Sequence, residues 1–321
     1  MGTAFGSPAL GKLYALLLRL RPVQRGTLMP FSGELVHGAF HRWLKNAAPD
    51  VATWLHDGNK PRLFTCSSLQ FPLPRQQIFE AERGNVYLPL EPEKTYTVRI
   101  TLLLGELLPL FQNALMRFNS REMVAKKSPF MQIGKQLFTL EEVISNNDDA
   151  FDWTGSTSFA DLVEGITVKK LGGVEPLRLE FATLTTFNRG NQKNRAYGNH
   201  YARLPLPQYV FPFLAKRWQE LAPPELTGIV QKERVEAYAL DEGVIINDYD
   251  LKPHMVKFTT HRQEGFIGTC KYLLRGPDEP TTDEVRLTMR QQILLLGQLA
   301  FYTGVGYKTA MGMGRVRSIS G

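Results

Sequence analysis

The pattern of apolar and polar residues in the first half of the chain predicts alternating strands and helices. Residues 12–20 form an apolar run typical of a buried strand. Residues 29–45 carry apolar side chains at helical spacing, and we expect Ser32 to cap that helix. A second helix at about 108–118 and a strand at 132–143 complete this half.

Two further strands are expected between these helices, and they are expected to pair. They are residues 85–90 and residues 95–103. In the second, apolar residues alternate with Thr97, Arg99 and Thr101, so one face should be buried and the other exposed to solvent.

The second half repeats the same order of elements. Its expected strands are residues 177–184, 243–258 and 265–274 with a short one after the last glycines, and its expected helices are residues 207–221 and 284–301. The last helix places Arg286 and Arg290 opposite its apolar stripe.

Residues 145–165 are acidic, polar and weakly periodic, which is typical of a domain connection. We therefore expect an N-terminal domain over residues 1–150, a connection over 151–175 and a C-terminal domain over 176–321.

Each half reads as strand, helix, strand, strand, helix, strand. This order is the ferredoxin-like plan, in which two helices cover one face of an antiparallel sheet. The predicted fold class is α+β, with two tandem ferredoxin-like domains that resemble RNA-recognition motifs. RNA-binding modules commonly use the uncovered sheet face, but unrelated enzymes share the plan, so the fold does not by itself decide function.

Composition narrows the class of protein. With 43% apolar residues among 321, the chain can bury the cores of two domains, which excludes a disordered chain. Lys and Arg exceed Asp and Glu by 38 to 31, and the resulting +7 charge favours a polyanionic partner. Cys66 and Cys270 form no C-x-x-C motif, and no apolar run reaches membrane-spanning length. We expect a cytoplasmic protein without a membrane segment.

A glycine-rich segment, GVGYKTAMGMGRVR, occupies residues 304–317. It follows a helix, whereas P-loops and dinucleotide-binding loops precede one. Glycine allows positive φ angles and close approach of a ligand, and cations beside it suit phosphates. The candidate RNA-binding residues here are Gly304, Gly306, Lys308, Gly312, Gly314, Arg315 and Arg317. The alternative is a turn that only packs between a helix and a strand.

A second basic segment lies at residues 188–203. Arg189, Lys193 and Arg195 are interleaved there with tyrosines, including Tyr201, that could stack on unpaired bases. We expect these three cations to contact RNA, although a solvated loop has a similar composition.

Three sequence blocks together resemble the CRISPR repeat-processing endoribonucleases, the Cas6 family. The blocks are the glycine-rich segment, GELVHGAF followed by WLHDGNKPRLFTCSSLQ, and EGFIGTCKYLL. They lie in both halves and in the family's order. The resemblance implies two tandem ferredoxin-like domains that cut the repeat of precursor CRISPR RNA without a metal or other cofactor.

The resemblance also implies candidate catalytic residues. His56 matches the family's catalytic histidine. Arg62 stands where members often have lysine, and His41 stands where some have tyrosine, so these two positions depart from the family pattern. The chemistry needs a base at the 2′-oxygen, an acid at the leaving 5′-oxygen and a cation near the phosphoryl oxygens. We expect His41 and His56 to be the acid–base pair, in either order, and Arg62 to stabilise the transition state.

Other interpretations remain open. His37 and His41 are one helical turn apart and could bind a metal, but no third ligand has suitable spacing, so no metal site is expected. A non-catalytic RNA-binding subunit could share the fold, and a phosphate-binding metabolic enzyme could use the glycine-rich segment. The expected partners are CRISPR repeat RNA and, as a further candidate, a multi-subunit CRISPR interference complex. The sequence is compatible with a monomer or a homodimer.

Overall fold

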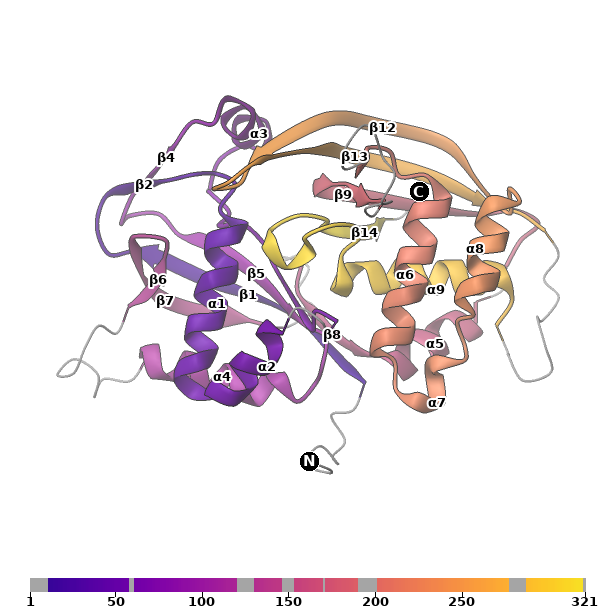
Figure 1. Cartoon of the computed structure of the whole chain (residues 1–321), viewed down its shortest axis with the longest axis horizontal. Helices are drawn as coiled ribbons and strands as arrows, with labels where there is room; N and C mark the ends of the chain where they lie inside the picture. The colour runs from indigo at the N-terminus through magenta and orange to yellow at the C-terminus, as the bar shows by residue number, and fades with distance from the viewer. Residues whose placement is uncertain are drawn as a thin grey trace, which may run out of the picture. The chain divides into compact units, whose positions relative to one another are not determined.

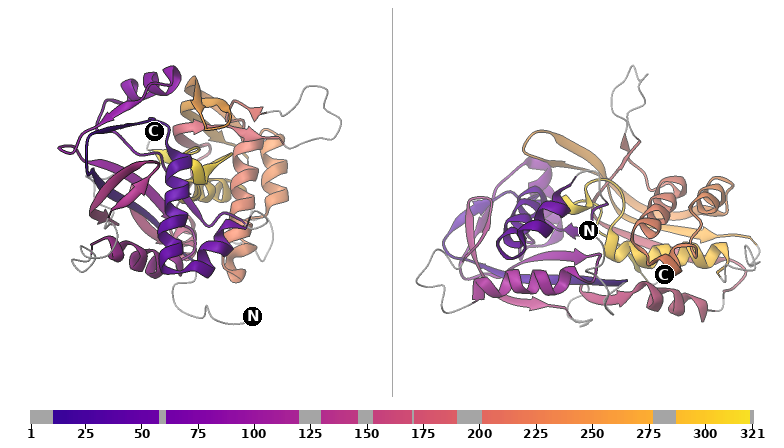
Figure 2. Two further views of the ribbon diagram at one scale, coloured as in Figure 1. Left: turned by 60° about the vertical axis from the view of Figure 1, so that its left-hand side comes forward. Right: turned by 60° about the horizontal axis from the view of Figure 1, so that its bottom comes forward.

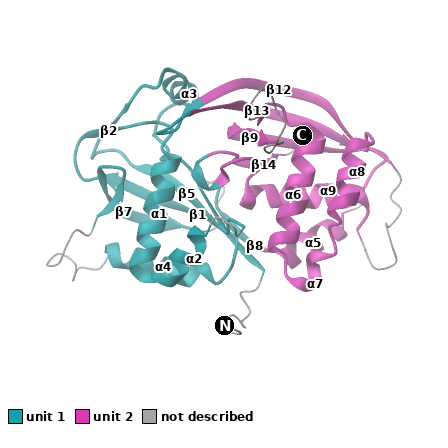
Figure 3. Cartoon of the chain, in the orientation of Figure 1, with its two compact units in different colours: residues 1–156, 256–261, 310–312 teal, residues 157–255, 262–309, 313–321 magenta. Residues whose placement is uncertain are grey.

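The computed structural model describes residues 11–57, 61–119, 130–145, 153–169, 171–189, 201–276 and 287–319. The chain divides into two compact units (Figure 3). Unit 1 comprises residues 1–156, 256–261 and 310–312, and unit 2 comprises residues 157–255, 262–309 and 313–321. Two short pieces from the second half of the chain therefore belong to unit 1.

Unit 1 contains a sheet with the strand order β3-β5-β1-β7-β6. The strands are β1 (Lys12–Pro22), β3 (Phe64–Cys66), β5 (Tyr96–Leu102), β6 (Met131–Ile133) and β7 (Gln136–Ile144). The expected strand at 132–143 is thus a hairpin of two strands, β6 and β7, paired antiparallel. The helices are α1 (Gly33–Ala47), α2 (Pro49–His56), α3 (Arg75–Gly84) and α4 (Leu107–Asn119).

Helices α1 and α4 cover the sheet because each has one apolar stripe (Figure 1). The Phe40 ring of α1 stacks on Phe64 of β3 at 4.2 Å between centroids and lies 5.3 Å from Phe111 of α4. This aromatic contact joins both helices to the sheet.

Ser32 does not cap α1 with its side chain. Its hydroxyl instead accepts a hydrogen bond from the Leu69 amide at 3.0 Å, which ties the start of the helix to the chain after β3.

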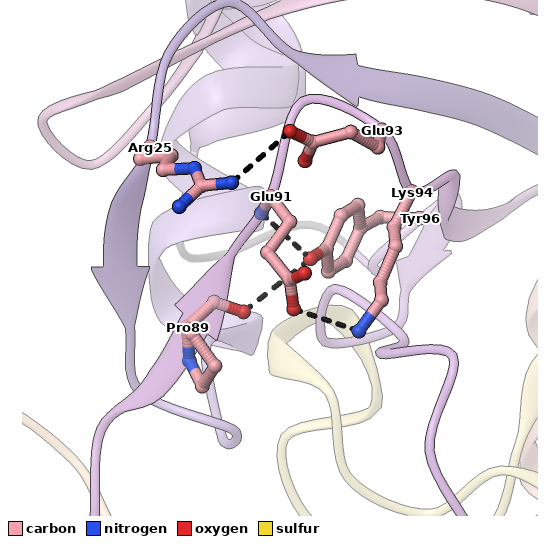
Figure 4. Close-up of polar contacts among 6 residues, drawn as sticks. All are labelled: Arg25, Pro89, Glu91, Glu93, Lys94 and Tyr96. Carbon is pink, nitrogen blue, oxygen red and sulfur yellow. Dashed lines mark hydrogen bonds and ion pairs between the residues drawn. The ribbon is translucent and has the colours of Figure 1, made fainter.

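The expected pairing of residues 85–90 with 95–103 is wrong. Strand β4 (Leu88–Leu90) pairs with β2 (Gly26–Leu28), whereas β5 pairs with β1 and β3. Pro89, in the middle of β4, has no N–H to donate to a ladder, so it suits a small two-stranded edge. The turn between β4 and β5 is held by the Tyr96 hydroxyl, which accepts from the Glu91 amide at 3.0 Å and donates to the Pro89 carbonyl (Figure 4).

The expectation of one exposed face on β5 is also wrong. Arg99 is 3% exposed and Thr101 is fully buried. The Thr101 hydroxyl lies 2.7 Å from that of Thr65, and Arg99 Nε donates to the Trp153 carbonyl at 2.7 Å while its guanidinium lies over the Trp153 ring. The polar residues are satisfied within the protein, which an alternating pattern cannot distinguish from solvation by water.

Unit 2 contains a four-stranded sheet in the order β12-β13-β9-β14. Its strands are β9 (Glu175–Thr185), β12 (Val244–Lys257), β13 (Arg262–Leu274) and β14 (Val316–Ile319), and β10 (Phe187–Asn188) and β11 (Tyr201–Ala202) form a separate hairpin. Strand β8 (Gly155–Ser158) pairs with β1 in the sheet of unit 1. The helices are α5 (Phe159–Thr167), α6 (Pro207–Leu221), α7 (Pro224–Thr227), α8 (Lys232–Leu240) and α9 (Met289–Thr303).

Helices α6 and α8 lie side by side (Figures 1 and 2), and α9 packs between α6 and the sheet strands β9 and β14. Arg290 of α9 is 3% exposed, contrary to its expected place on the outer face of this helix. Its guanidinium donates to the backbone carbonyls of Gly172 and Gly173 at 2.6 and 2.9 Å. Arg286 lies outside the described residues.

Part of the expected connection, residues 159–167, is helix α5, which begins with a capping box between Ser158 and Asp161.

Both units have the ferredoxin-like strand order, so the predicted fold class is confirmed. If the four main strands of each unit are numbered along the chain, both sheets read 2-3-1-4: β3-β5-β1-β7 in unit 1 and β12-β13-β9-β14 in unit 2. Within the described ranges, no helix is long and apolar enough to cross a membrane.

Candidate active site: a histidine cluster in unit 1

Helix α1 presents two histidines on one face. His37 and His41 are one turn apart, and their ring centroids are 4.7 Å apart. Both rings also lie against Phe64 of β3, at 5.5 and 5.3 Å. The spacing along the helix brings the two histidines together, and the sheet beneath the helix holds them in place.

Helix α2 brings a third histidine to this face. Pro49 stands at the first turn of α2, where its missing N–H is not needed, and Ala52 and Leu55 are buried. The helix ends at His56, whose exposed ring lies 5.2 Å from that of His41 at an interplanar angle of 73°. The structure therefore brings together the two histidines proposed from sequence and adds His37 as a neighbour.

Arg62 lies next to the three histidines. Its Nη1 donates to the Leu55 carbonyl at 3.0 Å, close to the end of α2. Burial is the main cause of the lowered pKa of both His37 and His41, and the charge of Arg62 lowers it further. One permanent cation and three imidazoles thus occupy one part of unit 1. We call His37, His41, His56 and Arg62 the histidine cluster.

Burial keeps part of the cluster neutral. Desolvation, followed by the charges of His37, His56 and Arg62, lowers the pKa of His41 to about 4. Both ring nitrogens of His41 are covered, and neither makes a hydrogen bond of standard geometry within the described part of the chain. In the free protein at neutral pH, His41 is therefore an uncharged proton acceptor.

The glycine-rich segment contacts the cluster through its backbone. His37 Nδ1 lies 3.0 Å from the Ala310 carbonyl oxygen. A carbonyl only accepts hydrogen bonds, so Nδ1 carries the proton and Nε2 is left as an acceptor. The glycine-rich segment also lies close to the start of α1. This requires glycine at position 33, because a Cβ there would lie 2.2 Å from the Met311 carbonyl oxygen.

The four glycines proposed for RNA binding all have positive φ, from 64° to 90°. The space beside them is filled by the protein itself. A Cβ at Gly306 would lie 2.4 Å from the Thr186 carbonyl oxygen, and one at Gly314 would lie 2.2 Å from that of Val305. Close packing within the chain thus accounts for these glycines, which is the alternative that the sequence left open. Contact of Gly304, Gly306, Gly312 and Gly314 with RNA stays a prediction.

The proposed RNA-binding cations differ in their surroundings. Arg317 Nε pairs with Glu180 at 2.8 Å. Lys308 Nζ lies 5.3 Å from the centre of the Tyr307 ring, and the Arg189 guanidinium lies 5.3 Å from that of Tyr209. Lys193 and Arg195 lie outside the described residues.

From the sequence, His37 is a candidate only for metal binding. Its spacing of four residues from His41 was the signal that it shares a face with that histidine. Among the residues that the structure describes, no group of three or more His, Cys, Asp or Glu side chains is placed to hold a metal ion.

Comparison with known proteins finds similarity to one family. Residues 179–316 match the family model described as CRISPR-associated endoribonuclease Cas6. The resemblance to the Cas6 family is confirmed. The match lies in the second half of the chain, where it includes residues 304–316 of the glycine-rich segment. A search of curated proteins finds no significant match.

Solved Cas6 structures share the fold. The product complex of Cas6 TTHB231 has a TM-score of 0.68 at 22% identity and covers 96% of this chain and 100% of that one. The product complex of Cas6 TTHA0078 has a TM-score of 0.59 at 22% identity with the same coverage. Thermus thermophilus Cas6 (TTHB231) gives 0.58, 22% identity, and coverage of 96% and 98%.

Proposed function

We propose that this protein is a Cas6 endoribonuclease that cuts the repeat of precursor CRISPR RNA without a metal ion. The RNA's own 2′-hydroxyl is the nucleophile: a bond from the 2′-oxygen to phosphorus forms, and the bond from phosphorus to the 5′-oxygen breaks. One protein group takes the 2′-hydroxyl proton and another gives a proton to the 5′-oxygen. The products are a 2′,3′-cyclic phosphate and a 5′-hydroxyl.

The observation that carries the proposal is the approach of His41 to His56, with Arg62 beside them. The acid and the base must reach two oxygens on the same phosphorus, so they must be neighbours. The structurally similar Cas6 proteins include product and substrate-mimic complexes, which supports RNA as the ligand.

The electrostatics favour one division of roles. His41 is uncharged in the free protein, so it can accept the 2′-hydroxyl proton. His56 is exposed at the end of α2 and is the group that meets the phosphate first and protonates the leaving oxygen. Arg62 stabilises charge on the phosphoryl oxygens and, being permanently protonated, does not transfer a proton. Because the His41 nitrogens are covered, the proposal requires neighbouring side chains to move when RNA binds.

The test is cleavage of repeat RNA in EDTA by the wild type and by His41→Ala, His56→Ala and Arg62→Ala, with both new RNA ends mapped. His261→Ala is the matched control, because His261 is an exposed histidine of unit 1 outside the cluster. We expect loss of cleavage by about 10²-fold or more in the first two variants, with RNA binding retained.

A substrate with a single 2′-deoxy sugar just upstream of the cut site tests the nucleophile. Cleavage of that substrate would refute attack by the 2′-hydroxyl. Wild-type protein that binds repeat RNA but never cuts it would favour the alternative of a non-catalytic RNA-binding subunit.

A further inference from the structure

A second candidate site lies entirely within unit 2, apart from the histidine cluster. It is a cavity of about 420 Å³, within the range of about 300–1,000 Å³ typical of ligand pockets. Four elements meet around it: β10, the first turns of α6, helix α8 and the glycine-rich segment. Its lining includes the aromatic residues Phe187, Tyr209, Phe213 and Tyr307 and the polar residues Asn188, Arg189, Gln208 and Glu236. We call it the aromatic pocket.

The aromatic walls are held by packing within unit 2. The rings of Phe187 and Tyr209 lie 5.8 Å apart, and those of Tyr201 and Tyr307 lie 5.6 Å apart. Gly306 allows Tyr307 to line the pocket. Its φ of 90° lets the chain turn close to Thr186, where the Tyr307 amide donates to the Thr186 carbonyl at 2.8 Å. The pocket is therefore built by the fold.

The polar groups on its rim differ in chemistry. Arg189 is exposed, and its guanidinium lies over the Tyr209 ring, where it can also meet a phosphate. Glu236 is exposed on α8 and has no ion-pair partner among the described residues. Burial and the neighbouring Tyr201 raise the pKa of Tyr307, so its phenol is neutral at physiological pH. Stacking surfaces, one cation and one carboxylate thus surround a single cavity.

We propose that the aromatic pocket binds one unstacked base of the repeat RNA and prefers guanine. Aromatic rings stack on any base, but a carboxylate only accepts hydrogen bonds. Guanine offers two adjacent donors, N1–H and N2–H, to Glu236, whereas uracil offers one donor flanked by two acceptors. Arg189 contacts the adjoining phosphate. This inference rests on the proposed function, because it assigns a specificity site for the same RNA.

The experiment compares three fluorescently labelled RNA heptamers: uridines with a central guanosine, with a central inosine, and with uridine throughout. Dissociation constants are measured by fluorescence anisotropy with the full chain. We expect the guanosine heptamer to bind about tenfold more tightly than the uridine heptamer, with inosine between them because it lacks the N2 amino group.

Glu236→Gln should bring the guanosine and uridine affinities within about twofold of each other. Glu233→Gln is the matched control, because Glu233 is exposed on the same helix and does not line the pocket. Tyr209→Leu should weaken binding of all three heptamers about tenfold, and Tyr209→Phe should restore it, since a phenyl ring still stacks. Because Glu236 is exposed, its replacement tests the proposal even if the Tyr209 variants do not fold.

Equal affinity of the wild type for all three heptamers would overturn the pocket assignment. So would guanine preference that survives in Glu236→Gln. Cleavage of full repeat RNA is assayed separately, which keeps the two proposals distinguishable. Cleavage without guanine preference refutes only the aromatic pocket, and guanine preference without cleavage refutes only the catalytic proposal.

Discussion

Acidification should destabilise this protein through His41. The pKa of His41 falls from 6.5 to about 4 in the folded chain, first because of burial and then because of His37, His56 and Arg62. Between these two values the unfolded chain binds more protons than the folded chain. The stability that neutral His41 contributes is therefore present above pH 6.5 and is lost as the pH falls toward 4.

The size of the effect follows from the two pKa values. At pH 5, the difference between the pKa of His41 in the unfolded chain and in the folded chain lowers the free energy of unfolding by at most about 2 kcal/mol. Part of the His41 ring is accessible to solvent, so we expect about 1 kcal/mol. His37 adds in the same direction, because burial also lowers its pKa, although its contact with the Ala310 carbonyl opposes this.

The assay is urea denaturation of the wild type and of His41→Asn at pH 7, 6 and 5. Asparagine removes the titrating group, so the variant should lose less stability than the wild type between pH 7 and pH 5. His261→Ala should keep the wild-type dependence. Equal loss of stability by the wild type and His41→Asn over this range would refute the argument that burial holds His41 neutral.

Three further outcomes are expected. Binding of repeat RNA should raise the pKa of His41, because a nearby phosphate favours the charged imidazole. An NMR titration of the ring, with and without an uncleavable RNA, measures this pKa. An unchanged pKa would mean that the phosphate does not bind near His41. Gly306→Ala should lower the free energy of unfolding by about 2 kcal/mol or more, measured by chemical denaturation, since its Cβ would lie 2.4 Å from the Thr186 carbonyl; a change below about 0.5 kcal/mol would contradict this. Arg290→Met should cost about 1–3 kcal/mol in the same assay because two carbonyls lose their donor, whereas no loss would show that water replaces it.

Local periodicity identified the elements that have a clear amphipathic pattern. Helix α6 begins and ends at the expected residues, 207 and 221, and β1 and β9 contain the strands expected at 12–20 and 177–184. Helices α3 and α8 were not foreseen. Each buries only one or two side chains, so few apolar residues mark these helices in the sequence.

Pairing and burial were decided by contacts between distant residues. The partner of β4 proved to be β2, some sixty residues earlier in the chain, and the alternation in β5 did not reveal that Arg99 is covered by Trp153. Local sequence can show that a side chain is polar. It cannot show whether water or a distant carbonyl satisfies that group.

The candidate site shows the same division. The sequence by itself indicated the ferredoxin-like class, the glycines that have positive φ and the resemblance that singled out His41, His56 and Arg62. Only the tertiary structure added His37 to them, placed the Ala310 carbonyl on its ring, and assembled the aromatic pocket from residues between 187 and 307. The physical reason is that helix and strand periods are properties of neighbouring residues, whereas a pKa, a tautomer or a cavity depends on groups that become neighbours only when the chain folds.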